Sequence, residues 1–188
     1  MIPIVSYYTK DTPYAQEVQG MKDSAERLDM FDLHILPVQN LGNWEANCQQ
    51  KADVLCRVAD ALDYPFLYVD ADARFQSVPH LFKYGIDKDY DIAVHYFRGH
   101  ELLSGTIWIN PTLETKSVLE EWRIFNKERP KEWDQRTLQR VINQSPKLRI
   151  LRLPCEYCYI FDLSQKYYPE CNPTIVHYQA SRKYKREV

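Results

Sequence analysis

The sequence predicts one α/β domain over residues 1–188, a sandwich with a mostly parallel central sheet flanked by helices. Segments of strand length alternate with amphipathic helical segments through the first two-thirds of the chain. The chain has 188 residues, of which 45% are hydrophobic, so it can bury one substantial core. No internal repeat, linker or low-complexity segment interrupts the pattern, which favours a single domain.

The first third of the chain alternates strands with helices. Thr12 is suited to cap the first helix, because Pro13 then occupies the first helical position. Apolar residues at spacings of three and four predict one buried face on each helix. The predicted strands are 2–8, 31–35 and 66–69, and the predicted helices are 13–28 and 44–62.

The rest of the chain continues with shorter elements. Thr112 is expected to cap a third helix, which Pro130 ends. A shorter helix begins near Asp134, with Leu138 and Val141 on its apolar face. Further strands are expected over 91–96, 106–109, 149–153 and 174–178.

The charge and hydropathy patterns narrow the class of function. The formal net charge is −2, which argues against a dedicated nucleic-acid binder, although basic residues gather over 182–186. No apolar run reaches membrane-spanning length. The first residues lack a basic segment followed by a cleavage site, so we expect a cytoplasmic location.

Two aspartates directly follow the apolar strand over 66–69. Asp70 and Asp72 are two residues apart, so on extended backbone their side chains point the same way. The carboxyl ends of strands open onto the ligand crevice of α/β folds, where two carboxylates can hold one hard cation. The alternative is a solvated turn between a strand and a loop.

Three further segments carry residue types suited to the same chemistry. His177 ends a late strand and precedes the cations Arg182 and Lys185, an arrangement that fits either a metal and phosphate site or a core histidine with a solvated end. Asp134 enters a helix and serves either as a cap or as a carboxylate in the site. Gly105 allows backbone to approach a ligand closely, or it belongs to an ordinary turn before the strand over 106–109.

The order of these segments resembles the GT-A fold glycosyltransferases, the nucleotide-diphospho-sugar transferases, over nearly the whole chain. The resemblance implies a Rossmann-like sandwich and a divalent metal ion, Mn²⁺ or Mg²⁺, on Asp70, Asp72 and His177. It implies Asp134 as the catalytic carboxylate. The positions implied to bind nucleotide or phosphate are Tyr7, Tyr8, Thr9, Lys51, Arg182 and Lys185, and those implied for the sugar or acceptor pocket are Ser104, Gly105 and Gln135.

By this resemblance, the expected activity is metal-dependent transfer of a hexosyl group from a nucleotide sugar, with a UDP-sugar preferred. The acceptor is open among glycans, small molecules, proteins and nucleic acids. Two other functions are weighed: a sugar-nucleotide-binding protein without catalysis, and a transferase that modifies nucleic acid and uses the basic end of the chain. Fold alone does not separate binding from catalysis.

The cysteines offer a competing metal site. Cys155, Cys158, Cys171 and His177 have a spacing that fits zinc-binding templates, and such a site would take His177 from the aspartates. The chain has five cysteines, an odd number, and no leader, which favours reduced thiols that pack as small apolar groups.

Overall fold

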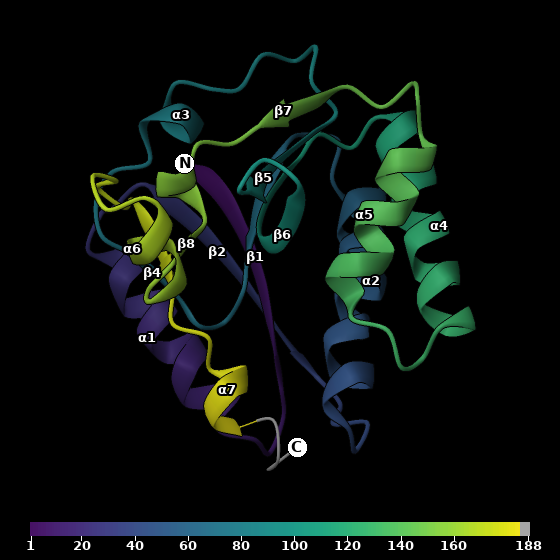
Figure 1. Ribbon diagram of the computed structural model, residues 1–188, viewed down its shortest axis with the longest axis horizontal. Helices are drawn as coiled ribbons and strands as arrows, with labels where there is room; N and C mark the ends of the chain where they lie inside the picture. The colour runs from purple at the N-terminus through teal and green to yellow at the C-terminus, as the bar shows by residue number, and fades with distance from the viewer. Residues whose placement is uncertain (185–188) are drawn as a thin grey trace.

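The computed structural model of the protein describes residues 1–184 and shows a mixed α/β domain built around a six-stranded sheet (Figure 1). The strand order is β2-β1-β3-β6-β5-β7. Five strands run parallel to one another, and β6 runs antiparallel to both of its neighbours. Their bounds are β1 Ile2–Thr9, β2 Phe31–Val38, β3 Phe66–Val69, β5 Ile92–Phe97, β6 Glu101–Ile109 and β7 Ile150–Arg152. The predicted mostly parallel sheet is therefore confirmed.

A second sheet of three short strands, which the sequence did not predict as a unit, lies beside the first. Its order is β4-β9-β8, with bounds Ala73–Phe75, Ile175–His177 and Tyr159–Ile160. Strand β4 begins directly after Asp72 and pairs antiparallel with β9, so that Ala73 lies opposite His177. This pairing brings together segments that are about a hundred residues apart in the sequence.

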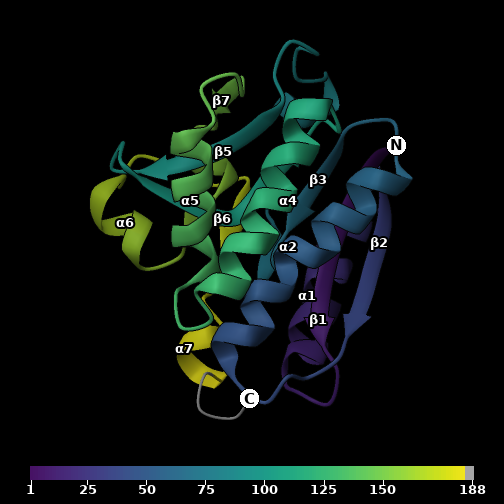
Figure 2. The ribbon, with the colours of Figure 1, turned by 90° about the vertical axis from the view of Figure 1, so that its right-hand side faces the viewer.

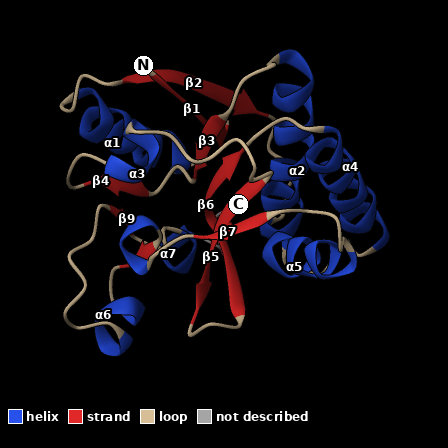
Figure 3. Cartoon of the chain, turned by 90° about the horizontal axis from the view of Figure 1, so that it is seen from above, coloured by secondary structure: helices blue, strands red, loops and turns tan. Residues whose placement is uncertain are grey.

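Helices cover both faces of the large sheet. Helices α2 (Trp44–Ala61), α4 (Leu113–Glu128) and α5 (Asp134–Gln144) cover one face, as Figures 2 and 3 show. The other face carries α1 (Tyr14–Glu26) and the small sheet with its short helices. These short helices are α3 (His80–Lys83), the 3₁₀ helix η1 (Cys155–Tyr157), α6 (Leu163–Tyr167) and α7 (Ser181–Tyr184).

Strand β3 shows how the sequence assigns residues to the two faces. Phe66 and Tyr68 belong to the core under α2, α4 and α5, whereas Leu67 and Val69 belong to the core under α1. The alternation follows from the two-residue period of a strand, and all four side chains are buried. Asp70 continues this register at the point where the strand ends.

Two local expectations differ from the structure. The segment 101–105 is not a turn, because β6 already begins at Glu101 and pairs Leu102 with Tyr96 of β5. Helix α1 begins at Tyr14, one residue later than expected, although Thr12 accepts the Tyr14 amide at 3.3 Å and also donates its hydroxyl to the Thr9 carbonyl. The expected cap at Thr112 is confirmed by its acceptance of the Thr115 amide.

Candidate active site

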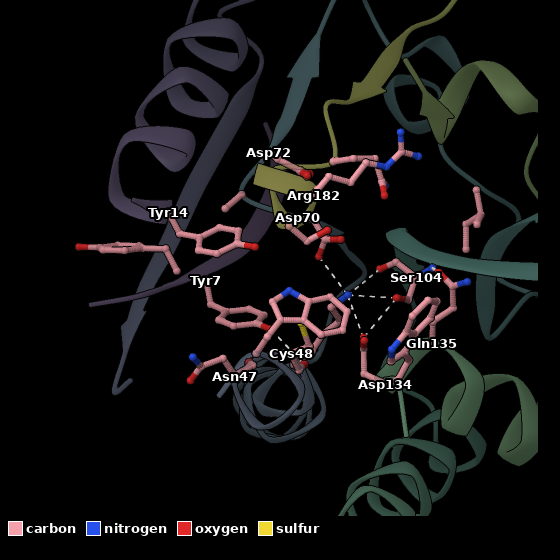
Figure 4. A pocket seen from close by; sticks show the side chains of 18 of the residues that line it. Tyr7, Tyr14, Asn47, Cys48, Asp70, Asp72, Ser104, Asp134, Gln135 and Arg182 are labelled. Carbon is pink, nitrogen blue, oxygen red and sulfur yellow. Dashed lines mark hydrogen bonds and ion pairs between the residues drawn. The ribbon is translucent and has the colours of Figure 1, made fainter. Parts of the chain in front are cut away.

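A cavity of about 450 Å³ opens where β1 and β3 end (Figure 4). Its wall is built from the ends of these strands, the first turns of α2 and α5, the beginning of β6 and the segment after β9. The site residues predicted from the sequence that line it are Tyr7, Tyr8, Thr9, Lys51, Asp70, Asp72, Ser104, Asp134, Gln135 and Arg182. Gly105 and His177 lie behind this wall, and Lys185 lies outside the described residues.

Asp70, Asp72 and His177 form a cluster whose ligand atoms all lie within 4.8 Å of one another. The Ala180 amide donates to Asp72 Oδ2 at 2.9 Å and fixes this carboxylate. Thr106 Oγ1 lies 2.8 Å from Nε2 of His177. A Thr106 oxygen that accepts the Nε2 proton leaves a lone pair on Nδ1, which is the tautomer that metal ligation needs.

The other ring nitrogen of His177 indicates that the cluster suits a cation. Nδ1 is buried, forms no hydrogen bond, and lies 3.5 Å from Asp72 Oδ1. Two carboxylates and one imidazole are a donor set suited to Mn²⁺-like ions. With His177 neutral as a metal ligand, the three ionised carboxylates of the site and the Lys51 ammonium together leave two negative charges, which one divalent cation balances. The residues therefore fit the metal ion that the family resemblance implied.

The titration behaviour of the cluster reflects its burial and charge. Burial disfavours the ionised form of Asp72, but His177 and the Ala180 amide outweigh burial and lower the pKa of Asp72. Burial lowers the pKa of His177, but Cys158 and Asp72 outweigh it and raise this pKa to about 10. Burial and the charge of Asp72 raise the pKa of Asp70 against the opposing effect of Lys51.

Lys51 lies at the centre of the site rather than at its rim. Its Nζ is 3.0 Å from Asp70 Oδ1 and 3.0 Å from Asp134 Oδ2. The same ammonium donates to Ser104 Oγ at 3.1 Å and to the Ser104 carbonyl at 3.2 Å. Figure 4 shows Asp70, Ser104 and Asp134 converging on one nitrogen. Burial disfavours the charged form of Lys51, but the two aspartates outweigh burial and raise its pKa.

Asp134 and Gln135 begin α5 and face β6. Asp134 Oδ2 accepts a hydrogen bond from Ser104 Oγ at 3.3 Å, and its backbone carbonyl accepts from Trp122 Nε1 at 2.9 Å. Gln135 Oε1 accepts from the Ser104 amide at 3.4 Å. The first turn of a helix also favours a negative charge, so α5 supports an ionised carboxylate at this position.

The two tyrosines at the end of β1 have different surroundings. Tyr7 is buried and donates to the Asn47 carbonyl at 3.1 Å, which ties β1 to α2. Tyr8 and Thr9 line the cavity beside Tyr14. Arg182 reaches the cavity from α7, and its guanidinium pairs with Asp162.

Tyr68 is a site residue that the sequence reasoning missed. Its hydroxyl donates to Asp70 Oδ1 at 2.6 Å, and its ring lies 5.3 Å from Lys51 Nζ. The signal was present, because Tyr68 precedes Asp70 by two residues and therefore shares its side of the strand. Trp44 and Trp133 were also missed; both line the cavity, with their rings edge to face at 6.0 Å.

Gly105 permits a close approach, but the partner is a protein side chain. A Cβ atom at this position would lie 2.9 Å from Cε1 of His177. The glycine therefore makes room for the imidazole behind the cavity wall, whereas the sequence suggested an approach to a ligand.

The competing zinc arrangement is not formed among residues 1–184. Cys155 and Cys171 group with Glu156, whereas His177 groups with the two aspartates. Cys158 belongs to neither group. The cysteine spacing therefore does not correspond to one four-ligand site in the described part of the chain.

The sequence family and the fold together identify a glycosyltransferase of the nucleotide-diphospho-sugar transferase class. A sequence model described as nucleotide-diphospho-sugar transferase matches residues 42–187. The chain belongs to this family. A search of curated proteins finds no match.

Solved structures share the fold at low sequence identity. A glycosyltransferase involved in the glycosylation of the major capsid of PBCV-1 is 15% identical, with a TM-score of 0.71 over 99% of this chain and 97% of that one. The glycosyltransferase GlyE of Streptococcus pneumoniae TIGR4 is 13% identical, with a TM-score of 0.67 over 94% of this chain but only 54% of its own. The galactosyltransferase LgtC, solved with donor and acceptor sugar analogues, is 11% identical, with a TM-score of 0.64 over 95% of this chain and 87% of that one.

No helix within residues 1–184 has both the length and the apolar character needed to cross a membrane.

Proposed function

We propose that residues 1–188 form a single metal-dependent hexosyltransferase domain that transfers a sugar from a UDP-sugar to an acceptor. The observation that carries this proposal is the buried Nδ1 of His177, which has no hydrogen-bond partner and lies in one cluster with Asp70 and Asp72. A buried imidazole nitrogen beside two carboxylates needs a proton or a metal cation, and the raised pKa of His177 means that a metal ion bound there displaces a proton.

In this proposal Asp70, Asp72 and His177 hold Mn²⁺ or Mg²⁺ at the edge of the cavity. When bound, the ion would neutralise negative charge on the departing nucleoside diphosphate. The Ala180 amide and Thr106 hydroxyl keep two of the three ligands in place. The Tyr68 hydroxyl keeps the third ligand, Asp70, in place.

Asp134 is the proposed catalytic residue. The transition state at the sugar is oxocarbenium-like, so a fixed carboxylate near the anomeric carbon stabilises it. Lys51 and Ser104 hold the Asp134 carboxylate through contacts of 3.0 Å and 3.3 Å. We assign Lys51 a positioning role, because its ammonium is buried among these groups.

The remaining cavity residues are assigned to the two ends of the donor. Tyr7, Tyr8 and Thr9 would border the base, and Arg182 would contact ribose or phosphate. Lys185 is assigned to the same phosphate group on the basis of the sequence. Ser104 and Gln135 would form the wall on the sugar and acceptor side, with Gln135 in hydrogen-bond contact with Ser104, and Gly105 would support this wall from behind, where it makes room for His177.

A thermal-shift panel of nucleotide sugars, each with and without Mn²⁺, tests the proposal. A donor at a hundred times its Kd stabilises the folded state by about 2.7 kcal/mol, which corresponds to a rise in Tm of about 5 to 10 °C. We expect this shift only when Mn²⁺ and a UDP-sugar are both present. Donor hydrolysis, followed as UDP release, then reports whether binding leads to turnover.

The matched variants are His177→Ala and His34→Ala. His34 is exposed, pairs with Asp32 at 3.0 Å and does not line the cavity. His177→Ala should abolish the Mn²⁺-dependent shift, and His34→Ala should keep it. A metal-independent shift would remove the metal from the proposal, and a shift without UDP release would favour the non-catalytic binding protein.

A further inference from the structure

Two cysteines meet at the base of a surface segment that the cavity chemistry does not use. Cys155 begins η1, Cys171 lies in the loop before β9, and their Sγ atoms are 2.8 Å apart. Both thiols are free and partly exposed. Small molecules can therefore reach them.

The distance between the sulfurs separates a disulfide from a zinc site. Two thiolates on a tetrahedral zinc at about 2.3 Å hold their sulfurs about 3.8 Å apart, because the angle at the metal is near the tetrahedral value. The observed 2.8 Å separation is well below that figure. In a disulfide the two sulfurs are about 2.05 Å apart, so the Sγ atoms need to move only slightly closer for the bond to form.

We propose that Cys155 and Cys171 form a reversible thiol–disulfide site whose reactant is a small-molecule disulfide. One cysteine thiolate attacks the reagent disulfide, forms a mixed disulfide and releases one reduced thiol. The second cysteine, as its thiolate, then attacks the first and releases the second reduced thiol. The two cysteine sulfurs are oxidised and the reagent disulfide is reduced to two thiols.

The disulfide would close a segment that forms part of the cavity wall. The segment contains β8 and α6, and its Ile160 and Leu163 line the cavity. A small apolar cluster that includes Ile160 and Cys158, separate from the two main cores, packs it against the β5–β6 hairpin. Such a segment belongs to the less stable parts of a fold, so a covalent closure has a large effect on it.

The same segment is tied to the strand that carries His177. The Thr174 amide donates to the Glu156 carbonyl at 2.8 Å, and the Phe161 amide donates to the His177 carbonyl at 3.1 Å. Each cysteine lies within three residues of the first of these bonds. The disulfide would therefore fix β9 and the cavity wall relative to each other.

The local charges predict how the reaction depends on pH. Burial raises the pKa of Cys171 to about 12, and both Cys155 and Glu156 add to this effect. The thiolate is the nucleophile, so attack by Cys171 should be slow at neutral pH and should accelerate as the pH rises.

The test uses the reduced, desalted full chain treated with oxidised glutathione. We expect the loss of two of the five thiols and a peptide that contains Cys155 joined to Cys171. We expect Tm to rise by about 5 to 10 °C, because the cross-link closes a loop of moderate length. Excess dithiothreitol should reverse both changes.

Cys155→Ser and Cys171→Ser should each abolish the rise in Tm, whereas Cys56→Ser, on the distant helix α2, should keep it. Glutathione left on single cysteines without a cross-link, or a cross-link without a change in Tm, would overturn the proposal. So would one zinc ion per reduced chain that Cys155→Ser removes. None of these readouts uses transferase activity, so the result is separate from the fate of the proposed function.

Discussion

The ammonium of Lys51 lies 3.0 Å from the carboxylate of Asp134, and both side chains are buried. Lys51 is also 3.0 Å from Asp70, which the proposed metal cluster contains. One cation thus connects the proposed catalytic carboxylate with the proposed metal ligands. The arrangement fixes the distance between the two halves of the site through a single side chain from α2.

Replacement of Lys51 by Met should destabilise the fold strongly. Met keeps the length of the side chain but leaves Asp134 as a buried carboxylate without its cation. Loss of one partner of a buried pair costs about 3 to 5 kcal/mol, and we expect the lower end because Asp70 is 34% exposed. Urea unfolding at pH 7 measures this cost as a fall in the urea concentration at the midpoint, while the slope of the unfolding free energy against urea concentration stays constant.

Two controls separate the ion pair from general effects of the substitution. Lys116→Met removes a partly exposed lysine that lies 3.7 Å from the exposed Asp60, and it should cost less than about 1 kcal/mol. Lys51→Met combined with Asp134→Asn should recover much of the lost stability, since no unpaired charge remains. Equal losses for the two lysine variants would contradict a structural role for the Lys51–Asp134 pair.

Replacement of Asp134 by Asn should stop turnover while the donor still binds. Asn has the same shape and can still accept hydrogen bonds from Lys51 and Ser104, but it carries no charge to stabilise the sugar. We expect the rate of UDP release to fall by about 10²- to 10⁴-fold. Calorimetry with a UDP-sugar and Mn²⁺ should give nearly the same Kd as for the wild type.

Asp60→Asn, on the outer side of α2, is the control for Asp134→Asn and should be neutral in both assays. A loss of donor affinity that matches the loss of rate would assign Asp134 to binding rather than to catalysis.

The main fold was predictable because periodicity encodes which face of each element is buried. The alternation of Phe66, Leu67, Tyr68 and Val69 between two cores is already visible in the sequence. The small sheet was predictable only in part. The expected strand over 174–178 is confirmed as β9, whereas β4 and β8 have two or three residues and depend on pairing across the chain. A strand that short has no periodicity of its own.

The candidate site was predictable as a set of residues but not as a network. The family resemblance implied Asp70, Asp72 and His177 as metal candidates, and the structure places them in one cluster. The resemblance assigned Lys51 to nucleotide or phosphate, but its contacts with Asp70, Asp134 and Ser104 were not accessible from sequence, because a lysine on a helix gives no sign of which groups its long side chain reaches. That information lies in how α2 and α5 pack beside β6.

Replacement of Gly105 by Ala should weaken metal binding without direct contact with the metal. The new methyl group would lie 2.9 Å from His177 Cε1, and Thr106 holds Nε2 of the ring at 2.8 Å. The imidazole must therefore tilt and lose its alignment with the carboxylates. Displacement of an orienting contact typically costs about 10- to 100-fold in metal affinity, which a Mn²⁺ titration measures.

The double variant Gly105→Ala, His177→Ala tests the cause of this effect. If the alanine acts only through the ring, it should add no further loss in the His177→Ala background. An unchanged Mn²⁺ affinity of Gly105→Ala would show that the ring does not need this space.

Replacement of Asp91 by Asn should lower stability in a way that depends on pH. Asp91 is 0% exposed and accepts hydrogen bonds from Thr112 Oγ1 at 2.8 Å and from the Arg149 amide and guanidinium at 2.8 to 3.0 Å. It thereby joins the start of α4 to the segment before β7. Hydrogen bonds to a charged group contribute about 1.5 to 3 kcal/mol, and since half of Arg149 is exposed and screened, we expect about 2 kcal/mol at pH 7.

The pH dependence follows from the direction of the pKa shift. Burial disfavours the ionised form of Asp91, but the bonds from Arg149 and Thr112 outweigh burial and hold its pKa below the ordinary 3.8. The folded state therefore binds the proton less readily than the unfolded state, so the stabilisation is complete above about pH 4 and is lost as the pH falls through the folded pKa. The difference in stability between wild type and Asp91→Asn should accordingly be constant from pH 7 to about pH 5 and narrow in stronger acid.

Asp89→Asn is the control, because it removes a carboxylate that is 87% exposed and 3.8 Å from the same arginine. Its stability should equal that of the wild type at every pH. A gap that stays constant down to pH 2 would mean that the shape of the Asp91 side chain, and not its charge, holds α4 to β7.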